Sequence, residues 1–162
     1  MTIEVRCARM NRASVPQAFA LLAGFLDDDP HYRASSAAYG DGGAPALQAA
    51  LELFIARPEQ GFVWLAFETN GTRAVGACVV CYAISTSRGT LVAKLDDVTI
   101  AADATGQGIG THMLRALFAE LAREDVTRID SACHRDNAGA WRFYARLGFQ
   151  PLQEERIALL IG

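Results

Sequence analysis

Hydrophobic residues recur along the chain with two different periods, and these predict where strands and helices lie. Alternation from Thr2 to Ala8 predicts a half-buried strand. Apolar residues at helical spacing predict one helix over Ala13–Leu26 and a second over Pro45–Arg57. The polar stretch from Asp27 to Pro45 predicts a long loop with room for one short helical turn. Loops of this length in compact domains often carry function.

Three strand-like runs follow one another in the middle of the chain. They cover Phe62–Thr69, Ala74–Ser85 and Leu91–Ile100. Asn70-Gly71 joins the first two and predicts a tight hairpin turn, because that pair readily takes positive φ angles. Arg88-Gly89 predicts the second turn. The three runs therefore form an antiparallel meander.

The last third of the chain alternates helices and strands. Apolar residues at helical spacing predict a helix over Gly108–Glu124, then a strand over Thr127–His134. A helix over Asn137–Gly148 follows, with Gly148 as its C-terminal cap. Phe149–Ile161 predicts one or two final strands. This order of elements predicts an α/β fold of the mixed α+β kind, with helices packed on the faces of the sheet.

The composition suits one globular domain spanning residues 1–162. Of its residues 51% are hydrophobic and 20% are charged, which separates it from disordered chains. The net charge of -3 argues against a nucleic-acid binder, which needs a basic surface. We expect no signal peptide and no membrane span, because no apolar run reaches about 18 residues.

Cysteine usage predicts a reducing compartment, the cytoplasm. The four cysteines are Cys7, Cys78, Cys81 and Cys133. Cys78 and Cys81 have the CxxC spacing of redox and zinc sites, but they lie within a predicted strand. Residues three apart on a strand point to opposite faces, so we expect buried, reduced thiols. No second cysteine pair is present and the histidines lack ligand spacing, so we predict no metal site.

A glycine-rich turn, Thr105-Gly106-Gln107-Gly108-Ile109-Gly110, joins the strand that ends at Ile100 to the next helix. Glycine lets a ligand approach the backbone closely, and free amides at a helix start attract a pyrophosphate. A P-loop would need Gly-Lys-Ser/Thr, and a dinucleotide fold would need a different glycine spacing. A helix start that binds nothing is the remaining alternative.

A second motif follows the glycine-rich turn along the chain. It comprises Asn137, Ala140, Phe143, Tyr144, Gly148 and Phe149. With the turn, it resembles the GNAT superfamily of N-acetyltransferases over Leu95–Phe149. The resemblance implies a mixed, mostly antiparallel sheet of six to seven strands, with helices on both faces. Thr105 departs from the Arg or Gln that usually opens the turn, which should weaken coenzyme A binding without abolishing it.

The resemblance implies acetyl-CoA as cosubstrate. The amides from Gly106 to Thr111 would hold its pyrophosphate, and the backbone of Val98 and Ile100 would pair with the pantetheine arm, which Asn137 would also contact. The predicted cofactor-binding residues are Val98, Thr99, Ile100, Thr105, Gly106, Gln107, Gly108, Ile109, Gly110, Thr111, Asn137, Ala140 and Tyr144.

Amine acetylation needs a deprotonated amine, a polarised carbonyl and a proton for the departing thiolate. Tyr144 is the predicted proton donor. It lies seven residues after Asn137, two turns along the same helix face, and matches the family's tyrosine acid. The alternative role for Tyr144 is that of a core residue whose hydroxyl is hydrogen-bonded within the protein.

Asp96 and Asp97 are the predicted bases. Adjacent carboxylates are unusual in an apolar strand and call for a reason. Regular alternation would point them to opposite sides, so only one could enter a given cleft. We expect Asp96 to act as base through water or to anchor the amine. A solvated pair without function is the alternative.

Together these residues predict an enzyme that transfers acetyl from acetyl-CoA to a primary amine of a small molecule by direct attack. Acidic residues at this place in the strand resemble those of family members that acetylate polyamines and other small amines. An acyl-CoA-binding regulatory or sensor module without turnover is the alternative. The resemblance also allows a homodimer, while no nucleic acid or membrane partner is expected.

Overall fold

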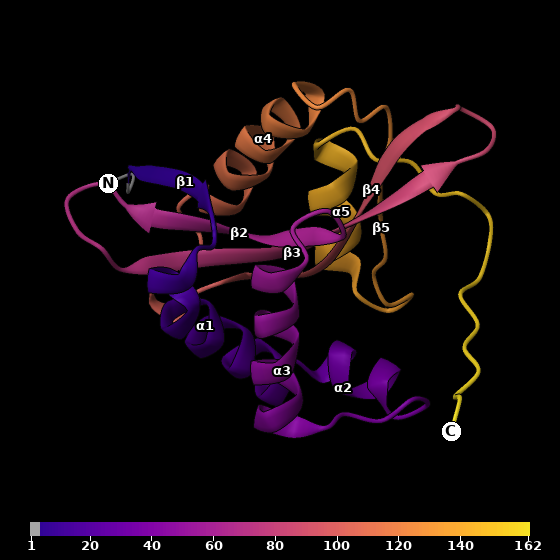
Figure 1. Ribbon diagram of the computed structural model, residues 1–162, viewed down its shortest axis with the longest axis horizontal. Coiled ribbons are helices and arrows are strands. Elements are labelled where there is room, and N and C mark those ends of the chain that lie inside the picture. The colour runs from indigo at the N-terminus through magenta and orange to yellow at the C-terminus, as the bar shows by residue number, and fades with distance from the viewer. Residues whose placement is uncertain (1–3) are drawn as a thin grey trace.

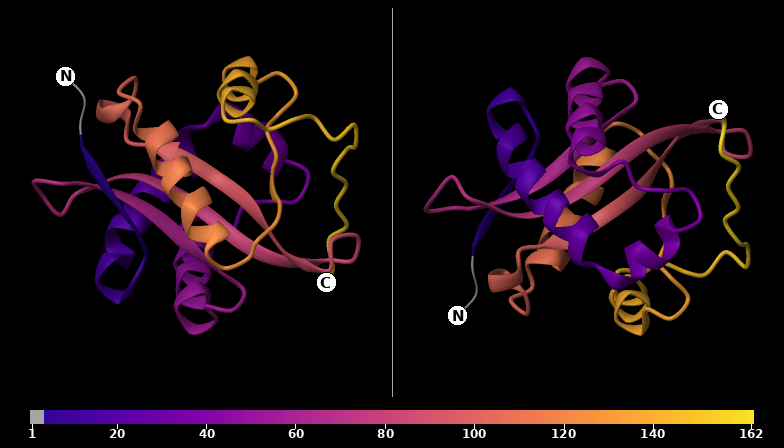
Figure 2. Two further views of the ribbon diagram at one scale, coloured as in Figure 1. Left: turned by 90° about the horizontal axis from the view of Figure 1, so that it is seen from above. Right: turned by 90° about the horizontal axis from the view of Figure 1, so that it is seen from below.

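A five-stranded sheet crosses the molecule, and helices cover both of its faces (Figures 1 and 2). The computed structural model describes residues 4–162, so the first predicted strand residues, Thr2 and Ile3, lie outside it. The strands, in spatial and chain order, are β1 Val5–Arg9, β2 Gly61–Glu68, β3 Ala74–Ser85, β4 Thr90–Ile100 and β5 Ile129–Ser131. The first four pair antiparallel and β5 pairs parallel to β4. The predicted mixed, mostly antiparallel sheet is confirmed.

The helices lie in two layers, as predicted. They are α1 Val15–Asp28, α2 Pro30–Ser36, α3 Gly43–Ala56, α4 Ile109–Ala122 and α5 Ala138–Arg146, with short 3-10 turns at Arg12–Ser14 and Ala102–Ala104. One core lies between α1, α3 and the sheet, and a second lies between α4 and the opposite sheet face. None of the helices in residues 4–162 is long and apolar enough to cross a membrane.

Close contact between α4 and the sheet depends on Gly76 of β3. A Cβ there would lie 2.9 Å from the Met113 sulfur and 3.0 Å from Ile100 Cδ1. The Trp64 indole of β2 donates a hydrogen bond to the Met113 carbonyl at 3.0 Å. Both contacts fix α4 on the sheet, and with it the glycine-rich turn at its start.

The stretch predicted as a loop between α1 and α3 contains a true helix, α2. Asp29 caps it, because its carboxylate accepts a hydrogen bond from the Tyr32 amide at 2.8 Å, and Pro30 opens its first turn. The polar composition of this stretch predicted a loop, so the helix start at Asp29-Pro30 was not recognised. The sequence prediction left room for one short helical turn in this stretch, and the structure has a regular helix there.

The tight turn predicted at Asn70-Gly71 is wrong. Neither residue has a positive φ. Instead the Glu68 amide donates to the Arg73 carbonyl at 3.1 Å, and the Gly71 amide donates to the Glu68 carbonyl at 3.2 Å. The connection is longer than a two-residue turn, so the primed geometry that the glycine would serve is not needed.

The prediction of final strands over Phe149–Ile161 is also wrong for this chain as described. Helix α5 ends at Arg146, and Gly148, with a φ of +98°, lies in the C-terminal cap as predicted. The Phe149 amide closes this cap on the Tyr144 carbonyl at 3.0 Å. Residues 150–162 are extended but pair with no strand in the part of the chain that the structure describes. The sheet therefore has five strands rather than six or seven.

Candidate active site

An opening between β4 and β5 is the centre of the candidate site. The two strands pair only from Ala93 opposite Ile129 to Leu95 opposite Ser131, and then diverge. From Asp96 to Ile100, β4 keeps its antiparallel neighbour β3 but has no strand on its other side among residues 4–162. That stretch therefore offers a free backbone edge, which is what an extended ligand needs for strand-like pairing.

A bulge in β4 lies at the mouth of this opening. Asp97 and Val98 together lie opposite Cys78, since Val79 pairs with Asp96 and Ala77 with Thr99. Asp97 has a φ of +53°, in the left-handed region that side chains seldom adopt. The strict alternation expected for the two aspartates therefore fails at Asp97, because an irregular strand does not send successive side chains to opposite faces.

Of the two aspartates, Asp97 has the carboxyl whose pKa is shifted. The pKa of Asp97 is raised to about 6, mainly by burial and then by the negative charges of Asp96 and Asp41, while Lys94 lowers it. Asp96 instead forms an ion pair with Lys94 at 3.3 Å. A carboxyl that titrates close to neutral pH is suited to accept a proton, so the environment favours Asp97 over Asp96 as a base.

Tyr144 of α5 lies on the other side of the opening. The pKa of Tyr144 is raised to about 12, mainly by burial and also by the neighbouring Cys78, Cys133 and Asp96, while the nearby Ser131 hydroxyl lowers it. The phenol therefore stays protonated at neutral pH and can donate. Its ring packs edge-on against Phe143 and Phe149, with ring centroids 5.4 and 5.2 Å away, which fixes its direction.

Ser131 is a site residue that sequence reasoning missed. It is the last residue of β5 to pair with β4, and its hydroxyl is near enough to Tyr144 to lower the pKa of the phenol. It is also the one side-chain oxygen within residues 4–162 that is buried without a hydrogen bond of normal geometry. A buried hydroxyl without a hydrogen-bond partner is unusual, and it indicates that a ligand or a small movement of a neighbouring group supplies the missing partner. A lone serine in a short strand gives no sequence signal.

The glycine-rich turn has an open backbone conformation that only glycine adopts readily. Gly106 and Gly108 have φ angles of +75° and +76°, and a Cβ on either would meet no atom within 4 Å. The first helical hydrogen bond of α4 runs from the His112 amide to the Gly108 carbonyl at 3.1 Å, so the preceding amides lack helical partners. The space in front of the turn is open, and the free amides fit a diphosphate.

The predicted cofactor residues lie along one path. For the residues of β4 and of the turn, this path runs from the free edge of β4 to the start of α4. The Ile109 side chain is buried in the core, so only its backbone is available to a ligand. Asn137 caps α5, where its side chain accepts a hydrogen bond from the Ala140 amide at 3.1 Å. That capping role was not predicted. Because the side-chain oxygen serves the cap, the side-chain NH2 group of Asn137 is the part left to contact a ligand.

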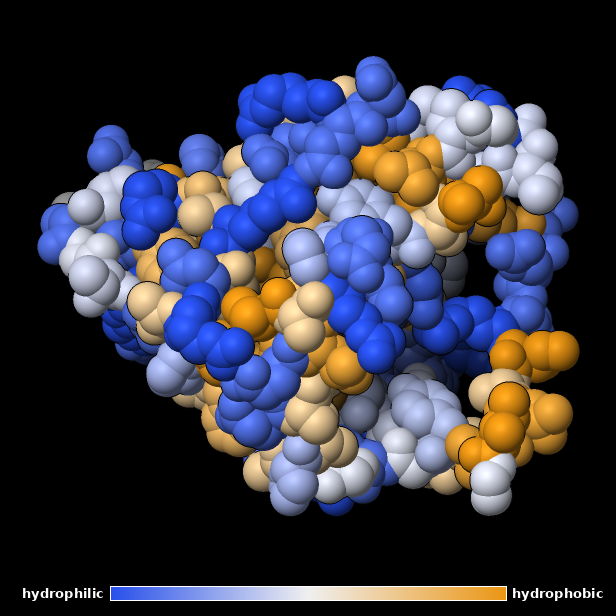
Figure 3. All heavy atoms as spheres, viewed as in Figure 1, coloured by the Kyte–Doolittle hydropathy of each residue, from blue (hydrophilic) through white to orange (hydrophobic). Residues whose placement is uncertain are grey.

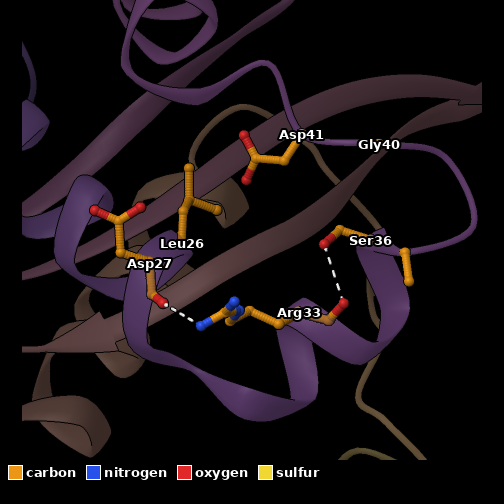
Figure 4. A pocket seen from close by; sticks show the side chains of 7 residues that line it. Leu26, Asp27, Arg33, Ser36, Gly40 and Asp41 are labelled. Carbon is orange, nitrogen blue, oxygen red and sulfur yellow. Dashed lines mark hydrogen bonds between the residues drawn. The ribbon is translucent and has the colours of Figure 1, made fainter.

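The opposite rim of the site comes from α2 and the loop after it. The Tyr32 hydroxyl donates to the Asp41 carboxylate at 3.1 Å, and Asp41 in turn affects the pKa of Asp97. A cavity of about 410 Å³ opens beside Asp41, between α1 and α2 (Figure 4). Its wall includes Asp27 and Arg33, and the Arg33 guanidinium donates to the Asp27 carbonyl at 3.5 Å. Sequence reasoning predicted a long loop here and missed Tyr32 and Asp41 as site residues.

Comparison with known proteins supplies the family context. The profile of the Acetyltransferase (GNAT) family matches residues 27–149, from the end of α1 to the end of the α5 cap. An N-acetyltransferase from Streptomyces griseus is 38% identical over 55 residues, which are 34% of this chain and 28% of that protein. The match therefore spans under a third of that relative's length.

Solved structures share the fold at low sequence identity. A protein described as "a probable acetyltransferase" superposes with a TM-score of 0.79 at 18% identity, covering 97% of this chain and 98% of its own. Ribosomal-protein-alanine N-acetyltransferase from Brucella melitensis biovar Abortus 2308 superposes with a TM-score of 0.74 at 12% identity, covering 96% and 99%. At such identities the likeness concerns the arrangement of strands and helices.

Proposed function

Because this chain belongs to the GNAT family of acetyltransferases, we propose that it moves the acetyl group of acetyl-CoA directly onto the primary amine of a small molecule. One observation carries the proposal: a protonated phenol, Tyr144, and a carboxyl that titrates near neutral pH, Asp97, flank the same opening in the sheet. A module that only binds the cosubstrate has no use for such a pair.

The cosubstrate brings an activated acetyl group on a thiol that can leave. We propose that the amides from Gly106 to Thr111 hold its diphosphate. The free edge of β4 at Val98 and Ile100 would then pair with the pantetheine arm, since no strand occupies that edge in residues 4–162. This position would direct the thioester toward the opening beside Tyr144.

Asp97 would take a proton from the incoming ammonium, directly or through water. The nitrogen lone pair would then form the new bond to the carbonyl carbon. A base works best when its pKa is near the working pH, and a pKa of about 6 leaves most of the carboxyl ionised at pH 7 to 8. Asp96, already paired with Lys94, would raise the pKa of Asp97 and help hold the cation.

Tyr144 would give its proton to the sulfur as the carbon–sulfur bond breaks. Each turnover thus moves one proton from the ammonium to Asp97 and one from Tyr144 to the sulfur. The second proton that the nitrogen loses as the amide forms passes to the Tyr144 phenolate, directly or through water, so the released amide and thiol are neutral. Solvent restores Asp97 to its starting state. Its aromatic neighbours Phe143 and Phe149 keep the phenol aimed at one point, which favours transfer to a positioned atom.

A small cationic amine is the acceptor that the rim favours. Asp41 and Asp97 place negative charge at the mouth, and Tyr32 adds an aromatic ring there. The adjoining cavity of about 410 Å³ has the size of small-molecule pockets. The four free thiols agree with a reducing compartment, so we place the reaction in the cytoplasm.

Release of free thiol from acetyl-CoA, measured with a panel of amines, tests the proposal. We expect release only when an amine is present, and an N-acetyl product by mass spectrometry. Asp97→Asn and Tyr144→Phe should each lower kcat strongly. Glu59→Gln, on the exposed turn before β2, is the matched control and should leave kcat unchanged.

The sensor alternative gives a different result. Acetyl-CoA would raise the melting temperature, but no amine would release thiol, and the Asp97 and Tyr144 variants would bind as tightly as the unaltered chain. That outcome would replace the enzyme by a binding module. Absence of any thermal response to acetyl-CoA would reject both functions.

A further inference from the structure

The hydroxyl of Ser131 is the one buried polar group whose presence the fold of residues 4–162 does not explain. Ser131 pairs with Leu95, at the last position before β4 and β5 diverge, so it lies at the edge of the opening in the sheet. No other side-chain oxygen or nitrogen in that range is buried without a hydrogen bond. Such a group lowers stability, because it loses water and gains no partner. An alanine would serve the strand better, so the hydroxyl calls for another reason.

The C-terminal tail does not supply the missing partner. Residues 150–162 are exposed throughout. In the space-filling view the hydrophobic side chains of the tail stand off from the body at the lower right, across a visible gap (Figure 3). The polar group that Ser131 does influence is the Tyr144 phenol of α5.

The two side chains differ in their freedom to move toward each other. The Tyr144 ring lies between Phe143 and Phe149, with ring centroids 5.4 and 5.2 Å away, so it is held in place. Serine has a single side-chain torsion before its hydroxyl, and rotation about it costs little. The movement that completes the hydrogen bond therefore belongs to Ser131.

The direction of the hydrogen bond follows from its effect on the phenol. A bond donated to the phenol oxygen stabilises the phenolate more than the neutral form, and so it lowers the pKa, as Ser131 does. Ser131 is thus the donor and Tyr144 the acceptor. The phenol proton stays free for the sulfur of the cosubstrate.

The reaction needs such a donor, because it leaves Tyr144 negatively charged for a moment. The phenolate has to persist from the transfer of its proton to sulfur until the nitrogen returns one. Burial and the neighbouring Cys78, Cys133 and Asp96 all oppose that charge, and they raise the pKa of Tyr144 to about 12. An ordinary cysteine thiol has a pKa of about 8.5. Transfer from the phenol to a thiolate is therefore uphill, and a donor already placed at the phenol oxygen lowers the barrier.

On the basis of the proposed function, we propose that Ser131 is a positioning residue: its hydroxyl rotates onto the Tyr144 oxygen and donates a hydrogen bond to it while the phenol gives up its proton. Ser131 keeps its own proton throughout, so the proton balance of the turnover is unchanged. The bond would fix the direction of the phenol and stabilise the charge that forms on it.

Ser131→Ala is the first test. Because the hydroxyl has no partner among residues 4–162, its loss should leave the melting temperature unchanged or higher. We expect kcat to fall about 10-fold or more, since hydrogen bonds to charged oxygens are the strong ones, while the KM for acetyl-CoA stays the same. Ser131→Thr keeps a hydroxyl and should restore most of kcat. A kcat for Ser131→Ala equal to that of the unaltered chain would overturn the proposal.

Ser85→Ala is the matched control. This serine is also buried at a strand end, but its hydroxyl accepts a hydrogen bond from the Arg88 amide at 3.2 Å. Its loss should lower the melting temperature and leave kcat unchanged, which is the reverse of the pattern expected at Ser131. A Ser131→Ala variant that loses stability as Ser85→Ala does would make Ser131 a structural residue and overturn the proposal.

A double-mutant cycle with Tyr144→Phe isolates the contact. If Ser131 acts through the phenol, Ser131→Ala should cost nothing further once the phenol hydroxyl is gone. Equal fold-losses with Tyr144 and with Phe at that position would show that Ser131 acts elsewhere.

Nuclear magnetic resonance tests the contact without any turnover. In protein labelled with ¹³C at the tyrosine Cζ atoms, the Tyr144 signal is the one missing from Tyr144→Phe. It should shift in Ser131→Ala and stay in place in Ser85→Ala. A Tyr144 signal that does not respond to Ser131→Ala would overturn the proposal even in an active enzyme. A signal that responds in a chain that releases no thiol with any amine would uphold the contact and reject the proposed function instead.

Discussion

Replacing Asp97 by Asn should make the protein more stable and less active at the same time. Asparagine has the same shape, and it is one of the few residues that readily takes the positive φ of +53° found at this position. The substitution therefore removes the charge while leaving the bulge in place. Asp97→Ala would confound the two effects, because alanine resists that backbone conformation.

The stability gain follows from the raised pKa of Asp97, which moves from 3.8 to about 6 on folding. The folded state holds this proton more tightly than the unfolded chain does. The contribution of Asp97 is therefore fully present below pH 3.8 and is lost as the pH rises through 6. At 1.36 kcal/mol per pKa unit the loss is about 3 kcal/mol, and partial exposure of the carboxyl reduces it to about 2 kcal/mol. Asparagine cannot ionise and escapes this loss.

Denaturant or thermal melts at pH 4 and pH 8 measure the effect. The variant and the parent should unfold alike at pH 4, whereas at pH 8 the variant should melt about 4–8 °C higher, given about 2–4 °C per kcal/mol for a domain of this size. In the thiol-release assay the same variant should lose about 10²–10⁴-fold in kcat/KM, and the acid limb near pH 6 should vanish. Equal melting at pH 8 would refute the buried, ionised carboxylate, and an intact acid limb would refute its role as base.

Other substitutions probe the remaining parts of the site. Tyr144→Phe should lower kcat by about 10²–10⁴-fold while the KM for acetyl-CoA changes little, because only the proton for the thiolate is lost; steady-state kinetics with one fixed amine checks this, and an unchanged kcat contradicts it. Gly108→Ala should destabilise the chain by about 1 kcal/mol, since alanine resists the φ of +76°, and should raise the KM for acetyl-CoA several-fold by turning the amides away; a normal KM would separate the turn from the diphosphate. Asn137→Ala should lower stability by about 1 kcal/mol through loss of the α5 cap, which a denaturant titration measures against Asn137→Asp, a variant that retains a capping oxygen.

Periodicity predicted the elements whose environments are regular. The apolar stripe of α4 follows the helical period along its whole length, and β2 is a continuous apolar run, so sequence alone placed both within a few residues. The short helix α2 was predicted only as a possible single turn, because seven residues hold too few turns to show a period and only its Asp29-Pro30 start distinguishes it. One or two strands were predicted over Phe149–Ile161 from the composition of that segment, but pairing depends on a partner that composition does not specify.

The residues of the candidate site also fall into two groups: those that a local motif predicts and those that only the folded sheet brings together. Tyr144 and the glycine turn belong to local motifs, in which spacing along the chain fixes spacing in space. Preference between Asp96 and Asp97 depends on the β4 bulge and on Lys94, and neither can be read from an alternating pattern. Ser131 reaches the site only through the β4–β5 pairing, which brings together residues more than thirty apart in the chain.

The extra residue in β4 makes the site sensitive to the length of that strand. Before the bulge the odd-numbered Ala93 and Leu95 face α4, and after it the even-numbered Val98 and Ile100 do. Deleting one residue there would turn Val98 and Ile100 away from α4 and bring Thr99 into the core. Substitutions in this strand should therefore be tolerated far better than insertions or deletions. Relatives that keep the reaction should keep the length of this strand even where their amino acids differ.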